Sequence, residues 1–167
     1  MPPDHVIRFA DLSDAGAVAE ILRAMDRHYR PDAELPVPAD YEAMATATIA
    51  GREGTRFAIC LSSDGRPIGV ACLAVLRPGR DVRGLLYVKD LFVKREARGA
   101  GLGTAIMRFL ARFCLERGIG RIDLGTDRSN LGAQRLYETL GGAVQEKVNY
   151  TFWTEGLQQL AAGDPRP

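Results

Sequence analysis

Three glycines at alternate positions, Gly99, Gly101 and Gly103, separate an apolar run at residues 86–93 from a segment with helical periodicity that begins at Leu102. Backbone N–H groups at a helix start have no intrahelical acceptor and lie at the positive end of the helix dipole. Glycines remove the Cβ atoms that would hold an anion away from those amides. The spacing therefore predicts a phosphate or pyrophosphate site, with a purely structural tight turn as the alternative.

The spacing of these glycines differs from that of two well-known phosphate loops. A P-loop requires a lysine and then Ser or Thr after its last glycine, whereas Gly103 is followed by Thr104 and Ala105. A dinucleotide fingerprint requires G-x-G-x-x-G and an acidic residue about 20 residues later in a βαβ unit. Asp123 is near that distance but falls inside a predicted strand. Neither loop is predicted here.

The elements that position this turn follow from the hydrophobic periodicity. We expect one domain over residues 1–162 and a disordered tail at 163–167, because 167 residues that are 46% hydrophobic can bury a core. Antiparallel strands followed by a βαβ unit predict an α/β fold with a mixed, mostly antiparallel central sheet and helices on both faces. The expected order is a strand (6–9), a helix capped by Ser13, a helix (40–50), three strands (57–61, 67–76, 84–93), a helix (102–117), a strand (121–125), a helix (129–140) and one or two strands (143–153).

Composition excludes several classes of function. A net charge of +1 lacks the positive excess of a nucleic-acid binder, so a small-molecule partner is expected. Cys60, Cys72 and Cys114 are embedded in apolar residues and are expected to be reduced core thiols. The sequence has no signal-peptide pattern and no run of about 20 apolar residues, which predicts a cytoplasmic protein without membrane contact. No cluster has metal-ligand spacing, so no metal site is expected.

Two motifs resemble those of a known family. Residues 98–103 (RGAGLG) look like the [RQ]-x-x-G-x-[GA] acetyl-coenzyme A loop of the GNAT N-acetyltransferases, and they follow the apolar strand DLFV at 90–93. Residues 130–142 (NLGAQRLYETLGG) are similar to the family's N-x-x-A-x-x-[LF]-Y-x-x-x-G-[FA] helix. Gly142 departs from the aromatic residue or alanine that often ends this motif. The resemblance covers residues 84–152 and implies a GNAT-like fold with acetyl-CoA as co-substrate.

The resemblance also implies where acetyl-CoA binds. Amides of the glycine turn would hold the pyrophosphate, and the strand before the turn would pair with the pantetheine arm between splayed strands at 84–93 and 121–125. A solvated side chain is the alternative for Arg98. The residues assigned in this way to the cofactor are Leu91, Phe92, Val93, Arg98, Gly99, Ala100, Gly101, Leu102, Gly103, Thr104, Asn130, Ala133 and Tyr137.

Acetyl transfer to an amine needs a neutral nucleophile, a polarised thioester carbonyl and a proton for the departing thiolate. The position of Tyr137 in the second motif implies a general acid, with simple packing of its helix as the alternative. Residues 87–93 (YVKDLFV) resemble the Y-x-E-D-x-x-V strand of polyamine-type members, so Asp90 is the candidate base, although a purely structural carboxylate fits equally well. Lys89 replaces the first acid of that strand. On a regular strand Lys89 and Asp90 face opposite sides, and a bulge could reverse which one faces the cleft.

The sequence thus predicts an N-acetyltransferase that moves the acetyl group of acetyl-CoA directly to the primary amine of a small molecule. An excess of three acids over residues 26–42 would attract a cationic amine, or would simply be solvated, and His28 and Tyr29 are further lining candidates. A protein or peptide amine as acceptor, a non-catalytic acyl-CoA-binding module and a nucleotide-binding domain stay open. Edge strands at 143–153 could pair between subunits, so a homodimer also stays open.

Overall fold

The computed structural model describes residues 5–51, 53–78 and 82–163, and its centre is a five-stranded sheet. The strands lie in chain order, and each neighbouring pair is antiparallel except β4 and β5, which are parallel. The mixed, mostly antiparallel sheet is therefore confirmed. Of the tail expected at 163–167, all but Gly163 lies outside the described residues. The strands are β1 (His5–Phe9), β2 (Thr55–Ser62), β3 (Pro67–Leu76), β4 (Leu85–Val93) and β5 (Ile122–Leu124).

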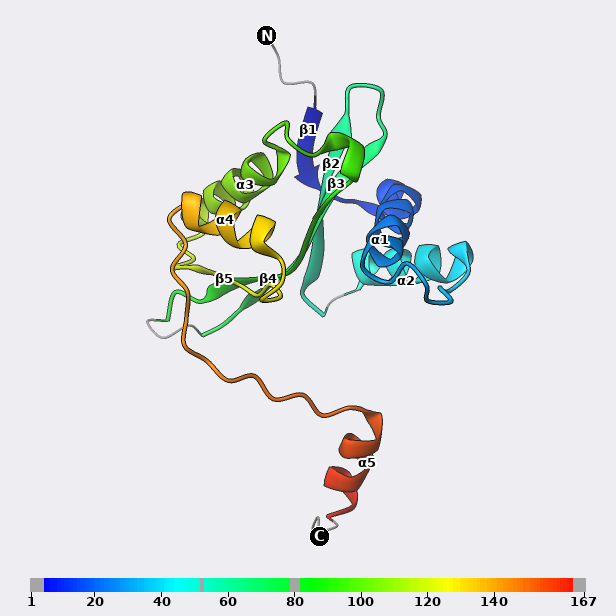
Figure 1. The fold of residues 1–167 in the computed structure, drawn as a ribbon, viewed down its shortest axis with the longest axis vertical. Helices are drawn as coiled ribbons and strands as arrows, with labels where there is room; N and C mark the ends of the chain where they lie inside the picture. The colour runs from blue at the N-terminus through cyan, green and yellow to red at the C-terminus, as the bar shows by residue number, and fades with distance from the viewer. Residues whose placement is uncertain (1–4, 52, 79–81, 164–167) are drawn as a thin grey trace.

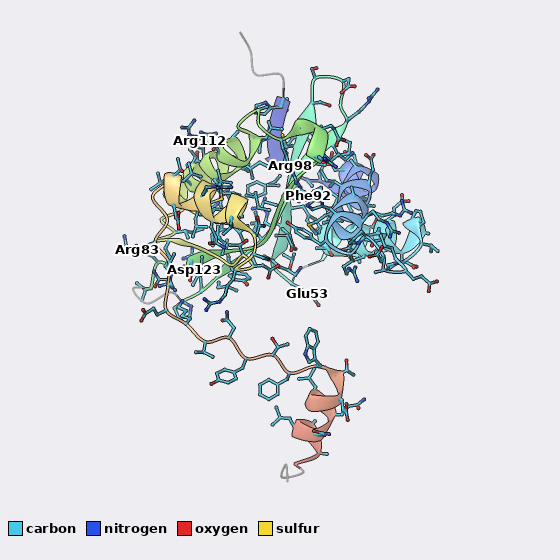
Figure 2. The ribbon with its side chains drawn as sticks, viewed as in Figure 1. Glu53, Arg83, Phe92, Arg98, Arg112 and Asp123 are labelled. Carbon is cyan, nitrogen blue, oxygen red and sulfur yellow. The ribbon has the colours of Figure 1, made fainter. Side chains whose placement is uncertain are left out.

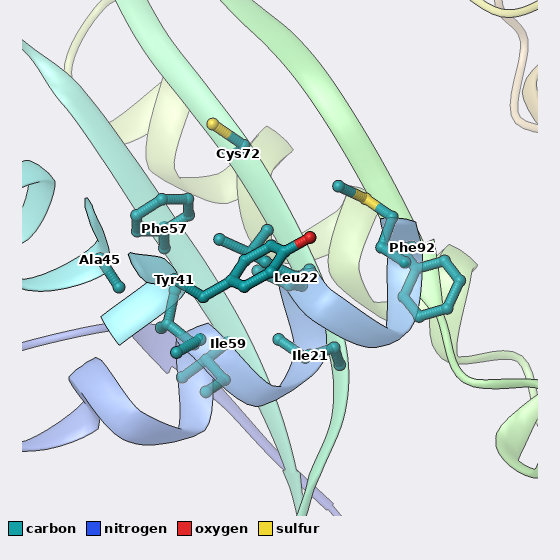
Figure 3. Packing of buried hydrophobic residues seen from close by; sticks show 12 residues of the cluster. Ile21, Leu22, Tyr41, Ala45, Phe57, Ile59, Cys72 and Phe92 are labelled. Atoms are coloured by element: carbon teal, nitrogen blue, oxygen red, sulfur yellow. The ribbon is translucent and has the colours of Figure 1, made fainter. Parts of the chain in front are cut away.

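Helices cover both faces of this sheet, as expected (Figure 1). On one face α1 (Ala15–Tyr29) and α2 (Pro38–Ala50) bury one apolar cluster, in which Tyr41, Phe57 and Phe92 meet side chains of α1 (Figure 3). On the other face α3 (Leu102–Glu116) buries a second cluster through the periodic stripe that the sequence predicted. The helix α4 (Leu131–Thr139) lies beside α3 (Figure 1).

The start of the first helix differs from the prediction. The capping residue is Asp11 rather than Ser13: Asp11 Oδ1 accepts from the Ser13 amide at 2.8 Å and opens a short 3-10 helix (Leu12–Asp14) that leads into α1. The buried carboxylate of Asp14 accepts from the Asp11 amide at 2.9 Å and from Arg8 at 2.5 and 2.8 Å. Hydrogen bonds and the charge of Arg8 lower the pKa of Asp14. This junction ties β1 to α1.

The strand β4 contains a bulge that decides which of its residues face α1. Cys72 of β3 lies opposite Asp90, but the next residue, Leu73, lies opposite Val88, so Lys89 is an extra residue on β4. Val88 packs into the α3-side cluster, whereas Cys72 belongs to the cluster under α1 and α2. The extra residue therefore keeps Asp90 on the α1 side.

The region after α4 contradicts the predicted strands at 143–153. Residues 143–153 form no strand, and within the described residues the sheet has none after β5. They instead run extended away from the domain to a helix that the sequence did not predict, α5 (Thr154–Ala162) (Figure 1). The sequence predicted strands here, but a local pattern cannot show whether the chain's own sheet will accept them as partners.

Two further expectations concern the cysteines and membrane helices. Cys60, Cys72 and Cys114 are all buried and free, as predicted. Burial raises the pKa of each thiol, that of Cys60 to about 11. Among the helices of the described residues, none is both long enough and apolar enough to cross a bilayer.

Candidate functional site: a glycine turn beside two diverging strands

The glycine turn has the geometry of an open helix start. Gly99 and Gly101 have φ angles of +84° and +74°, and Gly101 is the residue that precedes α3. A Cβ at either position would meet no described atom within 4 Å, so open space lies in front of this backbone. Ala105 N donates to Gly101 O at 2.9 Å as the first turn of α3 closes, which leaves the preceding amides without intrahelical acceptors. The turn fits an anion such as a pyrophosphate.

The third glycine has a different role, because it lets the two sequence motifs touch. A Cβ on Gly103 would lie 3.0 Å from Leu136 Cδ2, so the first turn of α3 packs closely against α4. Gly103, which the resemblance assigns to the cofactor, thus also permits a close contact between two helices. The contact brings the helix that carries Tyr137 next to the glycine turn.

The strands β4 and β5 separate just before the turn. Their parallel pairing covers only three residues, from Leu86 opposite Ile122 to Val88 opposite Leu124. Beyond Val88, β4 continues to Val93 paired with β3 alone among the described strands. The backbone of residues 89–93 is thus open on its β5 side, as the resemblance implied. A ligand with its own amides could add there as a short extra strand.

The side chains of the three assigned β4 residues do not share one direction. Phe92 is buried under α1, whereas Leu91 and Val93 pack against the cluster on the α3 side. At the open edge of β4, these three residues therefore share only their backbone groups, because their side chains lie on different faces of the sheet. Arg98 Nε also donates to the carbonyl of Val93 at 2.9 Å, so that carbonyl already has a partner.

The bulge of β4 places both of its charged residues together. Lys89 Nζ lies 2.7 Å from Asp90 Oδ2, with Lys89 exposed and the Asp90 side chain one quarter exposed. The hydrogen bond to Asp90, and more weakly the charge of Asp26 on α1, raise the pKa of Lys89. The strand is not regular at this point: the bulge that the sequence analysis allowed for is present, and Lys89 is its extra residue.

Arg98 connects the turn to α1 rather than pointing only into solvent. Its Nη2 lies 3.2 Å from His28 Nε2, and its guanidinium lies 5.7 Å from the centre of the Phe92 ring (Figure 2). Because arginine can only donate, His28 Nε2 accepts and the imidazole is neutral. Burial first, and then the charges of Arg98 and Arg95, lower the pKa of His28. Arg98 thus positions the end of β4 against α1.

Tyr137 lies half-buried on α4. Burial, and then its electrostatic interaction with Tyr29 of α1, raise the pKa of Tyr137 above the ordinary value of 10. Its phenol therefore holds its proton throughout the neutral range.

The remaining residues of the second motif shape α4. Asn130 Oδ1 accepts from the Ala133 amide at 3.1 Å and caps the helix, so both assigned residues have a structural contact. Gly142 donates its amide to the Tyr137 carbonyl at 2.8 Å, and a Cβ there would lie 3.0 Å from that oxygen. This close approach accounts for glycine where the family often has a larger residue.

The acidic excess at residues 26–42 is partly neutralised within the fold. Asp26 Oδ2 accepts from the Tyr41 hydroxyl at 2.6 Å and pairs with Arg30 at 2.8 Å. Burial and the hydrogen bond to Asp26 raise the pKa of Tyr41. The charge of Asp26 nevertheless contributes to the raised pKa of Lys89, so this acid of the segment influences the Lys89–Asp90 pair.

Two other features lie outside this site. Within the described residues, no group of three or more His, Cys, Asp or Glu side chains could hold a metal ion. A shallow surface hollow lies on the β1–β2 side of the sheet, away from the glycine turn. It is lined by Ala10, Asp11, Leu12, Ser13, Ile49, Thr55, Arg56 and Phe57.

Comparison with known proteins agrees with the two motifs and their geometry. The acetyltransferase (GNAT) family matches residues 17–142. The chain belongs to this family. It is 31% identical to the thialysine N-epsilon-acetyltransferase of Sus scrofa over 80 residues, which are 46% of this chain and 47% of that protein. The match thus spans about half the length of this curated relative.

Solved structures share the GNAT fold over nearly the whole chain. An integron cassette protein from the mobile metagenome of V. cholerae superposes with a TM-score of 0.87 at 26% identity, covering 95% of this chain and 98% of that one. An aminoglycoside acetyltransferase from an uncultured soil metagenomic sample shares the fold at 16% identity, with a TM-score of 0.74 and coverage of 92% and 97%.

Proposed function

We propose that this chain is an acetyl-CoA-dependent N-acetyltransferase that moves the acetyl group directly to the primary amine of a small molecule. The observation that carries the proposal is the open glycine turn at the point where β4 and β5 separate. Acetyl-CoA would supply the activated acetyl group. The amides of residues 98–104 would bind its pyrophosphate, and the open backbone of residues 91–93 would pair with its pantetheine arm.

Two side chains would handle protons during transfer. The Tyr137 hydroxyl would donate to the departing sulfur, and its raised pKa suits this role because the phenol stays protonated at the working pH. The Asp90 carboxylate would accept the proton of the incoming ammonium, directly or through one water. Lys89 holds that carboxylate at 2.7 Å and fixes its orientation. Direct transfer needs no acyl-enzyme, and the buried thiols with raised pKa values would be poor nucleophiles.

The acceptor would lie between α1 and β4, where the Tyr29 and Phe92 ring centres are 6.4 Å apart and the charge of Asp26 acts on Lys89. A mixed set of charges favours an acceptor that carries both an amine and an acid over a polycation. The relative from Sus scrofa is named for thialysine, which is such an amino acid. Location in the cytoplasm stays a prediction.

The proposal is tested by release of free coenzyme A thiol from acetyl-CoA over a panel of amines: thialysine, lysine, spermidine, an aminoglycoside and a peptide. We expect turnover on at least one small amine. Tyr137→Phe, which removes only the hydroxyl, should lower kcat about 100-fold or more at unchanged acetyl-CoA affinity. Tyr87→Phe, on an exposed tyrosine of β4, is the matched control and should keep full activity.

Three other outcomes of these measurements would each indicate a different function, and a fourth would concern the role of Tyr137. Turnover on the peptide alone would favour a protein acetyltransferase. Tight acetyl-CoA binding with no turnover on any amine would favour a binding module, and a thermal shift with ATP but none with acetyl-CoA would favour a nucleotide-binding domain. Unchanged kcat in Tyr137→Phe would remove Tyr137 as the acid.

A further inference from the structure

His28, near the C-terminal end of α1, is joined to the start of the glycine turn by a hydrogen bond. Arg98 Nη2 lies 3.2 Å from His28 Nε2, and the imidazole also packs near the rings of Tyr29 and Phe92, with ring centres 5.1 and 5.8 Å away. Because a guanidinium can only donate, the histidine nitrogen must accept this bond. A neutral imidazole can accept it, whereas an imidazolium cannot.

The same arginine reaches the open edge of β4. The amide of Lys94 donates to the Ile68 carbonyl of β3 at 2.9 Å, so the peptide groups of Val93, one residue earlier, point to the opposite side, where β5 no longer pairs. Arg98 Nε donates to the Val93 carbonyl at 2.9 Å. A carbonyl oxygen can accept two hydrogen bonds, so Arg98 orients this group without excluding a ligand. Arg98 is thus held by one acceptor on β4 and one on α1.

A second contact, an ion pair, ties the same segment to α1. Lys94 Nζ lies 2.6 Å from Glu20 Oε1, and the Lys94 side chain is only 17% exposed. The junction between α1 and the end of β4 therefore has two polar links. Of these, only the link at His28 involves an imidazole, which is the side chain that ordinarily gains its proton between pH 5 and 8.

The charges around His28 oppose its protonation. Burial, and then the charges of Arg98 and Arg95, lower the pKa of His28 below the ordinary value of 6.5. Charged groups elsewhere on α1 and β4 have partners of their own: Glu20 pairs with Lys94, Asp26 with Arg30, and Lys89 with Asp90, while Arg27 donates to the carbonyls of Pro31 and Ala33. When His28 gains a proton, Nε2 carries a hydrogen and two cations lie side by side. The bond from Arg98 is then lost.

We infer that His28 is a positioning residue of the acetyl-CoA site: as a neutral acceptor it holds Arg98 across the end of β4, and its protonation releases Arg98 and weakens acetyl-CoA binding. This inference rests on the proposed binding of acetyl-CoA at the glycine turn. Release of Arg98 lets the last residue of β4 and the start of the turn move relative to α1. Binding must then order the amides of residues 98–104 at an added entropic cost.

Calorimetric titration of the full chain with acetyl-CoA at pH 8 and pH 5 tests the inference. His28→Gln places an amide oxygen near the position of Nε2 and keeps an acceptor at both pH values, so it should match the unchanged chain at pH 8. At pH 5 the unchanged chain should bind about threefold to tenfold more weakly than His28→Gln. His28→Ala has no acceptor and should bind more weakly than His28→Gln at both pH values.

The control is His5→Gln, which removes the second of the chain's two histidines. His5 lies on β1, which β2 and β3 separate from β4, so this change should leave the pH dependence of binding unaltered. Each comparison is made at one pH, because the phosphate monoester of the cofactor itself gains a proton near pH 6 and affects every variant equally.

The outcomes separate this inference from the proposed function. Equal affinity of the unchanged chain and His28→Gln at pH 5, or full affinity of His28→Ala at pH 8, would overturn the inference. Tighter binding by the unchanged chain at pH 5 would show that the imidazolium attracts the phosphates directly, and would also overturn it. Absence of acetyl-CoA binding in every variant at both pH values would instead refute the proposed site, and the inference with it.

A second measurement needs no ligand. In NMR spectra of the free protein, the Arg98 Nε–H signal should shift with the same midpoint as the imidazole signals of His28, and its hydrogen should exchange faster with water below that midpoint. In His28→Gln the Arg98 signal should stay constant over this pH range. An Arg98 signal that ignores the protonation of His28 would contradict the contact.

Discussion

At the scale of single residues, the insertion of Lys89 determines which face of the sheet carries Asp90. Without it, regular alternation would turn Asp90 toward the α3-side cluster, where an unpaired carboxylate is costly. With it, Asp90 lies opposite Cys72 and pairs with Lys89 on the α1 side. One extra residue thus moves Asp90 from the face covered by α3 to the face covered by α1, where it forms a partly exposed ion pair with Lys89.

A buried carboxylate outside the site makes a prediction about stability. Asp14→Asn should lower the free energy of unfolding by about 1.5–3 kcal/mol at pH 7, because it removes charge-assisted hydrogen bonds to Arg8 and the Asp11 amide. The folded-state pKa of Asp14 is lowered, so this contribution is present above the ordinary value near 4 and disappears as the pH falls through the folded pKa. Urea unfolding at pH 7 and pH 2.5 measures both values.

The matched control is Asp64→Asn, since Asp64 pairs with Arg66 on the surface with its side chain 53% exposed. That change should be nearly neutral at both pH values. An equal loss of stability in the two variants, or a loss in Asp14→Asn that persists at pH 2.5, would argue against the Arg8–Asp14 contact as the cause.

The sequence-based predictions about single residues that differ from the structure do so for a common reason, which is that each depends on tertiary contacts. Asp11 rather than Ser13 caps the first helical turn, and both are good caps separated by two residues, so only the fold selects one. The bulge at Lys89 depends on the register of β3 against β4, which no local pattern encodes. The contacts of Arg98 with Val93 and His28 require α1 to lie beside β4 and could not be predicted from its place in the motif.

At the scale of elements, the turn before α3 combines two kinds of glycine. Gly101 has a positive φ and open space before it, whereas Gly103 has Leu136 against it. Substitutions at Gly103 would disturb α4 as well as any ligand. Gly101 is therefore the position at which ligand binding and helix packing can be separated.

Gly101→Ala should weaken acetyl-CoA binding about tenfold or more, because the strained backbone and the added methyl group displace amides that bind a charged group. Gly118→Ala provides the control at the other end of α3: Gly118 has a φ of +64° and also has open space. Both changes should cost a similar 1–3 kcal/mol in unfolding free energy. Calorimetric titration with acetyl-CoA and thermal unfolding measure the two effects. Equal losses of binding in both variants would make the turn purely structural.

The secondary structure elements were largely predictable up to α4 because each has an amphipathic period and a clear turn signal. The hairpin of β2 and β3 and the stripe of α3 follow from these patterns alone. The region beyond Gly142 was not predictable to the same degree. We predicted strands there, but whether a strand pairs within its own chain depends on the direction in which the preceding turn sends it.

At the scale of the whole molecule, the contact between α3 and α4 links the glycine turn to the candidate acid. The helix α4 carries Tyr137 and packs against the first turn of α3 through Leu136, although none of its residues is fully buried. The position of Tyr137 relative to the turn therefore depends on this helix contact.

The three buried cysteines have a practical consequence for all of these measurements. Their thiols are shielded and their pKa values are raised, so the folded protein should contribute almost no background to a colorimetric thiol reagent. Colour in such an assay would then report the coenzyme A product alone. A cysteine introduced at an exposed position such as Val148 would likewise be the dominant reactive site for a fluorescent label, and the native cysteines could stay in place.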